Sequence, residues 1–263
     1  MILVEHLTKQ FVQPARFRVP AVTVQAVADM SFSADNGCIT GLLGANGAGK
    51  TTSLRIVAGL LGADSGRVLI DNIDVRENPR AALSRIGCLS DSRGLYPRLT
   101  ARENVIYYGR LQGLGQAAAV KRTDELGELL DMKELLDRRT DGFSQGERMK
   151  TALARALIHD PANLLLDEPT NGLDVVATRR LREALRHLAS PAGGSKCIVF
   201  STHIMQEVER LCADVSVVAG GRDVARGTVR ELCTQTGCDD FEDAFVALAF
   251  SPADAEVKAG ATA

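Results

Sequence analysis

One short glycine-rich run constrains this chain more than any other feature. Residues 44–52 read GANGAGKTT and fit the pattern G-x-x-x-x-G-K-[ST]. Glycines at the fixed positions let consecutive backbone N–H groups converge on phosphate oxygens, because no Cβ blocks the approach. Lys50 adds a positive charge for the outer phosphates of a nucleotide, and the Thr51 hydroxyl can ligate Mg²⁺. The residues expected to bind the nucleotide are Gly44, Ala45, Asn46, Gly47, Ala48, Gly49, Lys50, Thr51 and Thr52.

The residues on either side of this run support a phosphate site. Residues 38–43 form a short apolar stretch that is typical of a strand, and residues 52–61 have the composition of a helix. A helix N-terminus presents unpaired N–H groups and the positive end of its dipole to an anion. A strand, a glycine-rich turn and a helix in this order therefore favour a phosphate site over a glycine turn without a ligand.

Composition and charge limit the partners that we expect. The 263 residues carry a net charge of −2, so the chain lacks the basic field that nonspecific nucleic-acid binding requires, and we expect no nucleic-acid partner. No apolar run approaches the roughly 20 residues that span a bilayer. The first residues have neither the basic start nor the long apolar stretch of a signal peptide, which favours a cytosolic protein.

Strand and helix patterns alternate along most of the chain. Helical periodicity without a strand candidate runs from residue 100 to about 137, and two capping boxes are expected, one pairing Thr100 with Glu103 and one pairing Ser144 with Glu147. The alternation predicts an α/β fold with a parallel sheet and a mostly helical insertion. Strands are expected at residues 2–8, 22–24, 26–33, 38–43, 67–70, 86–89, 163–166, 197–200 and 215–218.

Two carboxylates follow an apolar strand in the second half of the chain. Residues 163–166 read NLLL and lead into Asp167 and Glu168. Because ligands bind at the carboxyl ends of parallel strands, we expect this pair to lie near the phosphate loop. Asp167 would then hold Mg²⁺ together with Thr51, and Glu168 would polarise a water for in-line attack on the γ-phosphate. The alternative is a carboxylate pair that only ends the strand.

With these motifs in this order, the chain resembles the nucleotide-binding subunit of an ATP-binding cassette (ABC) transporter. The family's signature sequence, typically LSGGQ, corresponds to residues 143–147, FSQGE, where Ser144 and Gly146 match. The resemblance implies that ATP is bound and hydrolysed with Mg²⁺ and that Ser144 and Gly146 contact its γ-phosphate. It also implies a P-loop NTPase (RecA-like) α/β fold, in which a parallel sheet core carries an N-terminal antiparallel β subdomain and an inserted α-helical lobe.

The same resemblance implies a domain organisation. Residues 1–250 would form a single ABC ATPase domain. A helical lobe at about 92–145 would separate the core segments 1–91 and 146–238. Residues 251–263, which are rich in alanine, are expected to form a flexible C-terminal tail.

Further positions resemble functional elements of the family. Residues 172–174, Gly-Leu-Asp, resemble the D-loop that contacts the partner subunit. His203 resembles the switch histidine that bonds the γ-phosphate, so the resemblance gives catalytic roles to His203 and Glu168. Phe11 resembles the aromatic residue that stacks on adenine. Phe17 is a rival for that role, and an aromatic residue without a ligand is a further alternative.

One position departs from the family pattern. The family normally has a glutamine after the strand at residues 86–89, where it reaches Mg²⁺ and the attacking water, and Asp91 stands at that position. An aspartate is shorter by one methylene and adds a negative charge beside the γ-phosphate. We expect Asp91 to keep a Mg²⁺-sensing role with altered coupling.

The resemblance also implies partners. Residues 94–105 resemble the segment of sodium-efflux and drug-efflux subunits that lies against the membrane partner, with Leu95, Tyr96 and Leu99 as apolar contacts; packing between the lobes is the alternative. In family structures the signature serine is too far from its own phosphate loop to cover the same nucleotide. The expected assembly is a head-to-tail dimer with a second ATP-binding subunit, a homodimer in the simplest case. It would bind an integral membrane permease peripherally at the cytoplasmic face of the inner or plasma membrane.

Three rival classes of protein share part of this pattern. A non-transport ABC ATPase would share the ATP site, but repair types carry long heptads or C-x-x-C modules and translation types carry two cassettes. A P-loop GTPase or nucleotide kinase would leave residues 143–147 unexplained, and the chain has no N-K-x-D segment. An importer subunit is the third, and the efflux-type segment at residues 94–105 favours export over it.

Overall fold

The computed structural model describes residues 1–13, 22–89 and 94–250 of the chain. Within these ranges, ten strands form one sheet in the order β5-β4-β1-β2-β10-β9-β3-β8-β7-β6. The strands are β1 (Ile2–Gln13), β2 (Val22–Ala34), β3 (Ile39–Leu43), β4 (Ser65–Ile70), β5 (Ile73–Asp74), β6 (Ile86–Leu89), β7 (Asn163–Asp167), β8 (Cys197–Thr202), β9 (Asp214–Ala219) and β10 (Arg222–Gly227).

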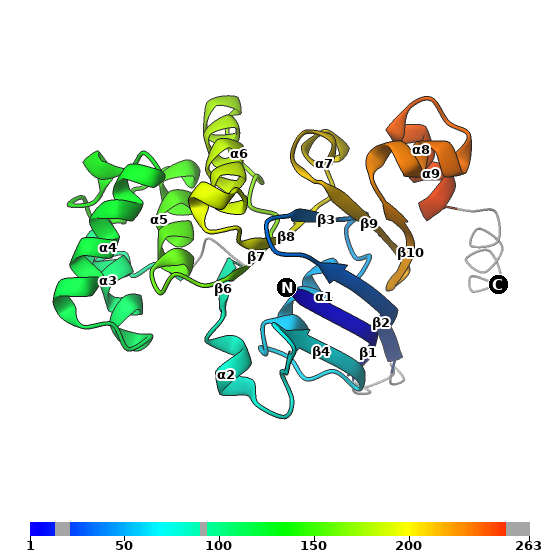
Figure 1. Ribbon diagram of the computed structural model, residues 1–263, viewed down its shortest axis with the longest axis horizontal. Helices are drawn as coiled ribbons and strands as arrows, with labels where there is room; N and C mark the ends of the chain where they lie inside the picture. The colour runs from blue at the N-terminus through cyan, green and yellow to red at the C-terminus, as the bar shows by residue number, and fades with distance from the viewer. Residues whose placement is uncertain (14–21, 90–93, 251–263) are drawn as a thin grey trace, which may run out of the picture.

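The helices fall into two groups at the ends of the molecule and several that pack on the sheet (Figure 1). α3, α4 and α5 gather at one end, and α8 and α9 lie at the other. The helices are α1 (Lys50–Val57), α2 (Pro79–Leu83), α3 (Ala101–Leu111), α4 (Gln116–Leu129), α5 (Gln145–Leu157), α6 (Val175–Ala189), α7 (Met205–Leu211), α8 (Val229–Thr236) and α9 (Phe241–Ala249), with 3₁₀ turns at Lys133–Leu135 and Pro191–Gly193. None of the described helices combines the length and the apolar character that crossing a membrane requires.

The sheet has a parallel part and an antiparallel part. β6, β7, β8, β3 and β9 run parallel, with Gly41 of β3 opposite Phe200 of β8. β1, β2, β4 and β5 are antiparallel, and β10 joins the two parts through one bridge between Arg222 and Asp29. β3 and β8 are buried along their whole length, as strands covered on both faces must be. The predicted α/β fold, with its parallel core, antiparallel N-terminal strands and helical insertion, is confirmed.

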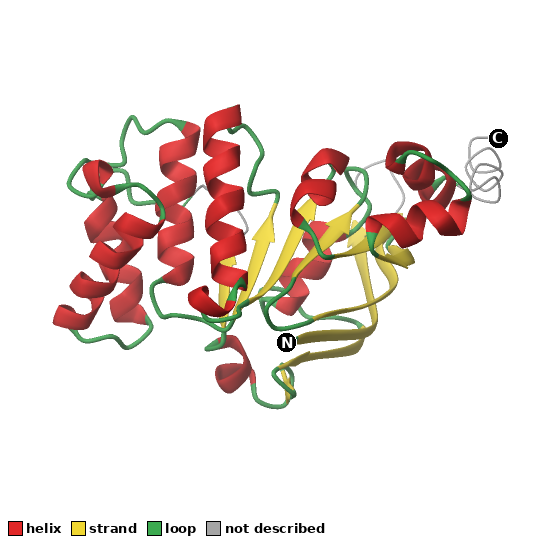
Figure 2. Ribbon diagram, turned by 45° about the horizontal axis from the view of Figure 1, so that its top comes forward, coloured by secondary structure: helices red, strands yellow, loops and turns green. Residues whose placement is uncertain are grey.

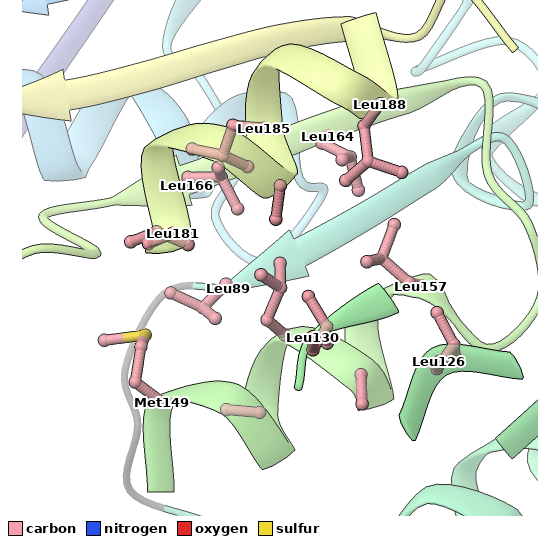
Figure 3. Close-up of a cluster of buried hydrophobic side chains, with 14 of the residues drawn as sticks. Leu89, Leu126, Leu130, Met149, Leu157, Leu164, Leu166, Leu181, Leu185 and Leu188 are labelled. Carbon is pink, nitrogen blue, oxygen red and sulfur yellow. The ribbon is translucent and has the colours of Figure 1, made fainter. Parts of the chain in front are cut away.

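Alternate side chains of the central strands face different layers. Leu164 and Leu166 of β7 pack with α5 and α6, whereas Leu165 belongs to a second cluster that includes Leu54 and Val57 of α1. Figure 3 shows Leu185 and Leu188 of α6 beside Leu166 and Leu164 of β7, with Met149 of α5 below Leu89. This shared cluster anchors the helices α4 and α5 to the sheet, so the helical insertion and the core meet through apolar contacts.

Both predicted capping boxes are present. The Thr100 hydroxyl accepts the N–H of Glu103, and the Glu103 carboxylate accepts the N–H of Thr100 at 2.8 Å. Ser144 and Glu147 make the same reciprocal pair at the start of α5. Each box satisfies two of the four N–H groups left unpaired at a helix start.

Several boundaries differ from the sequence-based expectations. Residues 22–24 are not a separate strand but the first part of β2. α1 begins at Lys50 and ends at Val57 rather than covering residues 52–61, because Gly59 adopts a left-handed φ of 67°. β10 was not expected, since its sequence RDVARG has little apolar signal and its side chains are exposed or half-buried. Figure 2 shows how the strands fan out between the two groups of helices.

Acidification should destabilise the protein through His159, which follows α5. Its Nε2 lies 3.0 Å from the carbonyl oxygen of Ile86, and its buried Nδ1 has no hydrogen-bond partner among the described residues. Burial lowers the pKa of His159 despite the nearby carboxylate of Asp160. The unfolded chain therefore binds the proton more readily, so the free energy of unfolding falls as the pH drops below about 6.5.

The measurement is urea unfolding at pH 7.5 and pH 5.5. His159→Gln should lose less stability between these pH values than the wild type does. His187→Gln, which changes an exposed ring on α6, should follow the wild type. Equal pH dependence in all three proteins would show that His159 does not contribute.

Candidate nucleotide site

The predicted phosphate loop connects β3 to α1, and its glycines are required by close backbone contacts. A Cβ on Gly44 would lie 2.3 Å from the carbonyl oxygen of Val218. Gly49 has a φ of 104°, and a Cβ there would lie 2.6 Å from the carbonyl oxygen of Ala26. No other residue type fits either position without moving the backbone. The loop encloses a cavity of about 130 Å³ lined by Ala26, Asn46, Gly47, Ala48, Gly49, Lys50, Thr51, Thr52 and Glu168.

Lys50 is buried at the base of this loop. Its ammonium donates to the carbonyl oxygens of Gly44 at 2.6 Å and Ala45 at 3.1 Å, and Nζ lies 3.9 Å from Oε1 of Glu168. Burial lowers the pKa of Lys50, and the carboxylates of Glu168 and Asp167 partly oppose this effect. The lysine is therefore held by the loop itself, with its charge directed into the site.

Thr51 and Asp167 meet at the carboxyl end of β7. The Thr51 hydroxyl donates to Oδ1 of Asp167 at 3.1 Å, and Ser201 of β8 donates to the same oxygen at 2.6 Å. Hydroxyl and carboxylate oxygens are the ligands that Mg²⁺ prefers, and phosphate oxygens and water usually complete its octahedron. Among the described residues no group of three or more His, Cys, Asp or Glu side chains could hold a metal ion. The hydroxyl of Thr51 and the carboxylate of Asp167 therefore fit a metal ion whose other ligands are nucleotide phosphates and water.

Glu168 and His203 face each other across the ends of two strands. Nδ1 of His203 lies 3.2 Å from Oε1 of Glu168, and Nδ2 of Asn171 lies 3.5 Å from its Oε2. Glu168 has a φ of 47°, a left-handed conformation that side chains rarely adopt. Its backbone turns there, so consecutive carboxylates serve different neighbours: Asp167 contacts Thr51, while Glu168 contacts Lys50 and His203.

Ser144 and Gly146 lie elsewhere, at the N-terminus of α5. The Ser144 hydroxyl is engaged in the capping box with Glu147, and Gly146 lies near Leu173 and Ala177. Asp174 caps α6 by accepting the N–H of Ala177 at 2.8 Å. The structure thus brings residues 143–147 next to the segment 172–177, not next to the phosphate loop of the same chain.

Phe11, the residue expected to stack on adenine, lies on the strand that pairs with β2. Phe11 of β1 is 40% exposed and lies opposite Val24 of β2, two residues from Ala26, which lines the cavity. The ammonium of Lys9 lies 5.7 Å from the centre of the Phe11 ring. Phe17, Asp91 and the tail at residues 251–263 lie outside the described residues.

Two contributors to this site were not expected from the sequence. Ala26 lines the cavity from β2, and nothing local in its sequence distinguishes it. Ser201 contacts Asp167 from β8. Ser201 precedes His203 by two positions, and residues two apart on a strand lie on the same side. Its place in the site could therefore have been predicted from the sequence.

Comparison with known protein sequences identifies relatives across most of the chain. Residues 27–171 match the ABC transporter family model. The ABC transporter ATP-binding protein NatA of Bacillus subtilis is 40% identical over 232 residues, which cover 88% of this chain and 93% of NatA. The linearmycin resistance ATP-binding protein LnrL of the same species is 33% identical, over 81% of this chain and 68% of LnrL. The Nod factor export ATP-binding protein I of Ralstonia nicotianae is 39% identical, over 83% and 68%.

Solved structures share the fold. A structure of an ATP-binding subunit of an ABC transporter superposes with a TM-score of 0.79 at 25% identity, over 94% of this chain and 99% of that one. The dimeric structure of MJ0796, a bacterial ABC transporter cassette, superposes with a TM-score of 0.76 at 24% identity, over 87% and 98%. The resemblance expected from the sequence motifs is therefore confirmed, and the chain belongs to the ABC transporter family as one of its ATP-binding ATPase subunits.

Proposed function

We propose that this chain powers an ABC exporter by hydrolysing Mg-ATP in a head-to-tail dimer coupled to a separate membrane permease. The observation that carries the proposal is the convergence of Lys50, Asp167, Glu168 and His203 around the cavity of the phosphate loop. The names of two relatives, one a Nod factor export protein and one a linearmycin resistance protein, support efflux over import. The exported substrate would be recognised by the permease.

Each residue of the site has a proposed role. The backbone N–H groups of the loop and the ammonium of Lys50 bind the phosphates. Thr51 and Asp167 would hold Mg²⁺, which, when bound, neutralises charge on the phosphate oxygens. Glu168 orients a water and accepts its proton, and His203 bonds the γ-phosphate at the mouth of the site. Phe11 is proposed to stack on adenine, and Asp91 to sense the metal.

The dimer is proposed because residues 143–147 lie apart from their own phosphate loop. Ser144 and Gly146 would complete the site of a second subunit, so that ATP favours the closed pair by contacting both. Val175 and Val176, next to Asp174, are 81% and 62% exposed. Two neighbouring exposed valines at the start of α6 suit a surface that a partner subunit covers. Hydrolysis removes the γ-phosphate contacts and lets the pair open.

The permease contact is proposed at the aromatic residues that follow Gly94. The rings of Tyr96 and Tyr107 are exposed and meet edge to face at 5.3 Å, whereas Leu95 and Leu99 are half-buried. Buried Asn104 holds the backbone of Tyr96 by accepting its N–H at 2.8 Å. A fixed aromatic surface on the helical lobe would let a membrane subunit move α5 together with Ser144. The subunit would then lie at the cytoplasmic face of the membrane without crossing it.

The test is ATP hydrolysis by the purified chain, alone and together with any multi-span membrane protein that a neighbouring reading frame encodes. We expect turnover that requires Mg²⁺, stops in EDTA and is stronger with ATP than with GTP. Recovery of the chain from detergent extracts with a multi-span membrane protein should depend on Tyr96 and Tyr107. Absence of metal-dependent hydrolysis in both preparations would contradict the proposal.

A further inference from the structure

Ser201 lies at the centre of the carboxylate pair on which the proposed function depends. It occupies β8 directly opposite Asp167 of β7 in the sheet register. Its side chain is completely buried, although a serine hydroxyl in a strand core has no apolar contribution to make. Burying a hydroxyl lowers the stability of the fold unless the hydroxyl forms hydrogen bonds. The Ser201 hydroxyl forms two.

The Ser201 hydroxyl connects the two carboxylate residues. It donates to Oδ1 of Asp167 at 2.6 Å, the usual length for a hydroxyl–carboxylate bond, and accepts the backbone N–H of Glu168 at 3.1 Å. The carbonyl oxygen of Ser201 also accepts that N–H at 3.1 Å. The Ser201 hydroxyl thus contacts the carboxylate of Asp167. The hydroxyl and the carbonyl oxygen of Ser201 both contact the backbone N–H of Glu168, the residue whose backbone is left-handed.

We propose that Ser201 is a positioning residue, which aims Asp167 at the metal bound with ATP and holds the backbone of Glu168 in its left-handed conformation. This inference rests on the proposed function of the site. A carboxylate that shares Oδ1 between Thr51 and Ser201 cannot rotate freely, so its second oxygen keeps one direction. The left-handed conformation of Glu168 is unfavourable by itself and persists only where neighbours enforce it.

His203 completes this arrangement from the same strand. It follows Ser201 by two positions, just beyond the end of β8, and its Nδ1 meets the Glu168 carboxylate at 3.2 Å. One strand and the residue after it therefore restrain Asp167, the backbone of Glu168 and the side chain of Glu168. Loss of the Ser201 hydroxyl should loosen Asp167 and the backbone of Glu168, whereas the contact between His203 and the Glu168 side chain should remain.

The chain offers a matched control for removing a buried serine hydroxyl. Ser216 of β9 is also completely buried, but its hydroxyl has no hydrogen-bond partner among the described residues. Ser201→Ala and Ser216→Ala remove the same atom from strands of the same sheet. Groups that hydrogen-bond a metal-ligating side chain typically contribute about ten- to a hundredfold in metal affinity or activity.

The experiment measures metal binding as well as turnover. Mn²⁺ is titrated into protein that is in excess over a non-hydrolysable ATP analogue. The signal of the unbound Mn²⁺ is followed by electron paramagnetic resonance. We expect Ser201→Ala to lower Mn²⁺ affinity and kcat each by about tenfold relative to Ser216→Ala, with the affinity for the analogue in EDTA equal in the two variants.

The outcomes separate this inference from the proposed function. Equal metal affinity and kcat in the two serine variants would overturn the positioning role while leaving the function intact. Weaker analogue binding in EDTA for Ser201→Ala alone would also overturn it, since the substitution would then disturb nucleotide binding itself and not the metal. A wild-type protein that neither hydrolyses ATP nor binds Mn²⁺ with the analogue would refute the function itself.

Discussion

Replacing Glu168 with glutamine should reduce the rate of ATP hydrolysis by about a hundredfold or more without weakening ATP binding. A glutamine keeps the size and one acceptor oxygen, but its amide cannot accept a proton from the attacking water. General-base catalysis typically contributes about 10²- to 10⁴-fold. Glu168 is the carboxylate that lines the phosphate-loop cavity, and its Oε1 lies 3.9 Å from the Lys50 ammonium.

The variant also tests the proposed dimer. If ATP joins two subunits and hydrolysis releases them, Glu168→Gln should elute as a dimer on gel filtration in Mg-ATP and as a monomer in ADP. Glu183→Gln is the matched control, because Glu183 is an exposed glutamate of α6 that pairs with Arg179 at 3.0 Å. It should hydrolyse ATP at the wild-type rate. An unchanged kcat in Glu168→Gln would refute the assigned base, and a monomer at saturating Mg-ATP would argue against the dimer.

Replacing Lys50 with methionine should strongly weaken ATP binding. Methionine retains the length of the side chain but loses the ammonium, which donates to the loop carbonyls of Gly44 and Ala45. Hydrogen bonds to charged groups contribute about 1.5–3 kcal/mol. Each 1.4 kcal/mol is tenfold in affinity, so the dissociation constant for ATP should rise about ten- to a hundredfold.

Lys196 is the control for this second prediction. It is buried to the same degree as Lys50, and its Nζ donates to Asp160 at 2.8 Å and to the carbonyl oxygen of Pro161 at 2.7 Å, outside the nucleotide cavity. Lys196→Met should destabilise the fold without changing ATP affinity measured by isothermal calorimetry. If both variants lost affinity equally, the effect of Lys50 would come from folding and not from phosphate binding.

Much of the fold followed from local sequence patterns. The apolar runs of β3, β7 and β8 and both capping boxes were predictable, because each depends on side chains within a few residues of one another. β10 was missed because it is held by pairing with β9 and β2 and not by its own composition. The end of α1 was misplaced because Gly59, which lies inside the range 52–61 expected to be helical, takes the left-handed conformation.

The nucleotide site also has a part that the sequence determined and a part that only the tertiary structure decided. The sequence alone determined the phosphate loop, the carboxylates Asp167 and Glu168, and the expected family, since their chemistry is written in short motifs. The tertiary structure decided how residues far apart in the sequence meet: Thr51 with Asp167, and Ala26 with Gly49 of the loop. It also placed Ser201 between the two carboxylates and Ser144 away from its own phosphate loop. Such contacts arise from strand order and register, which join distant segments and leave no mark on the local sequence.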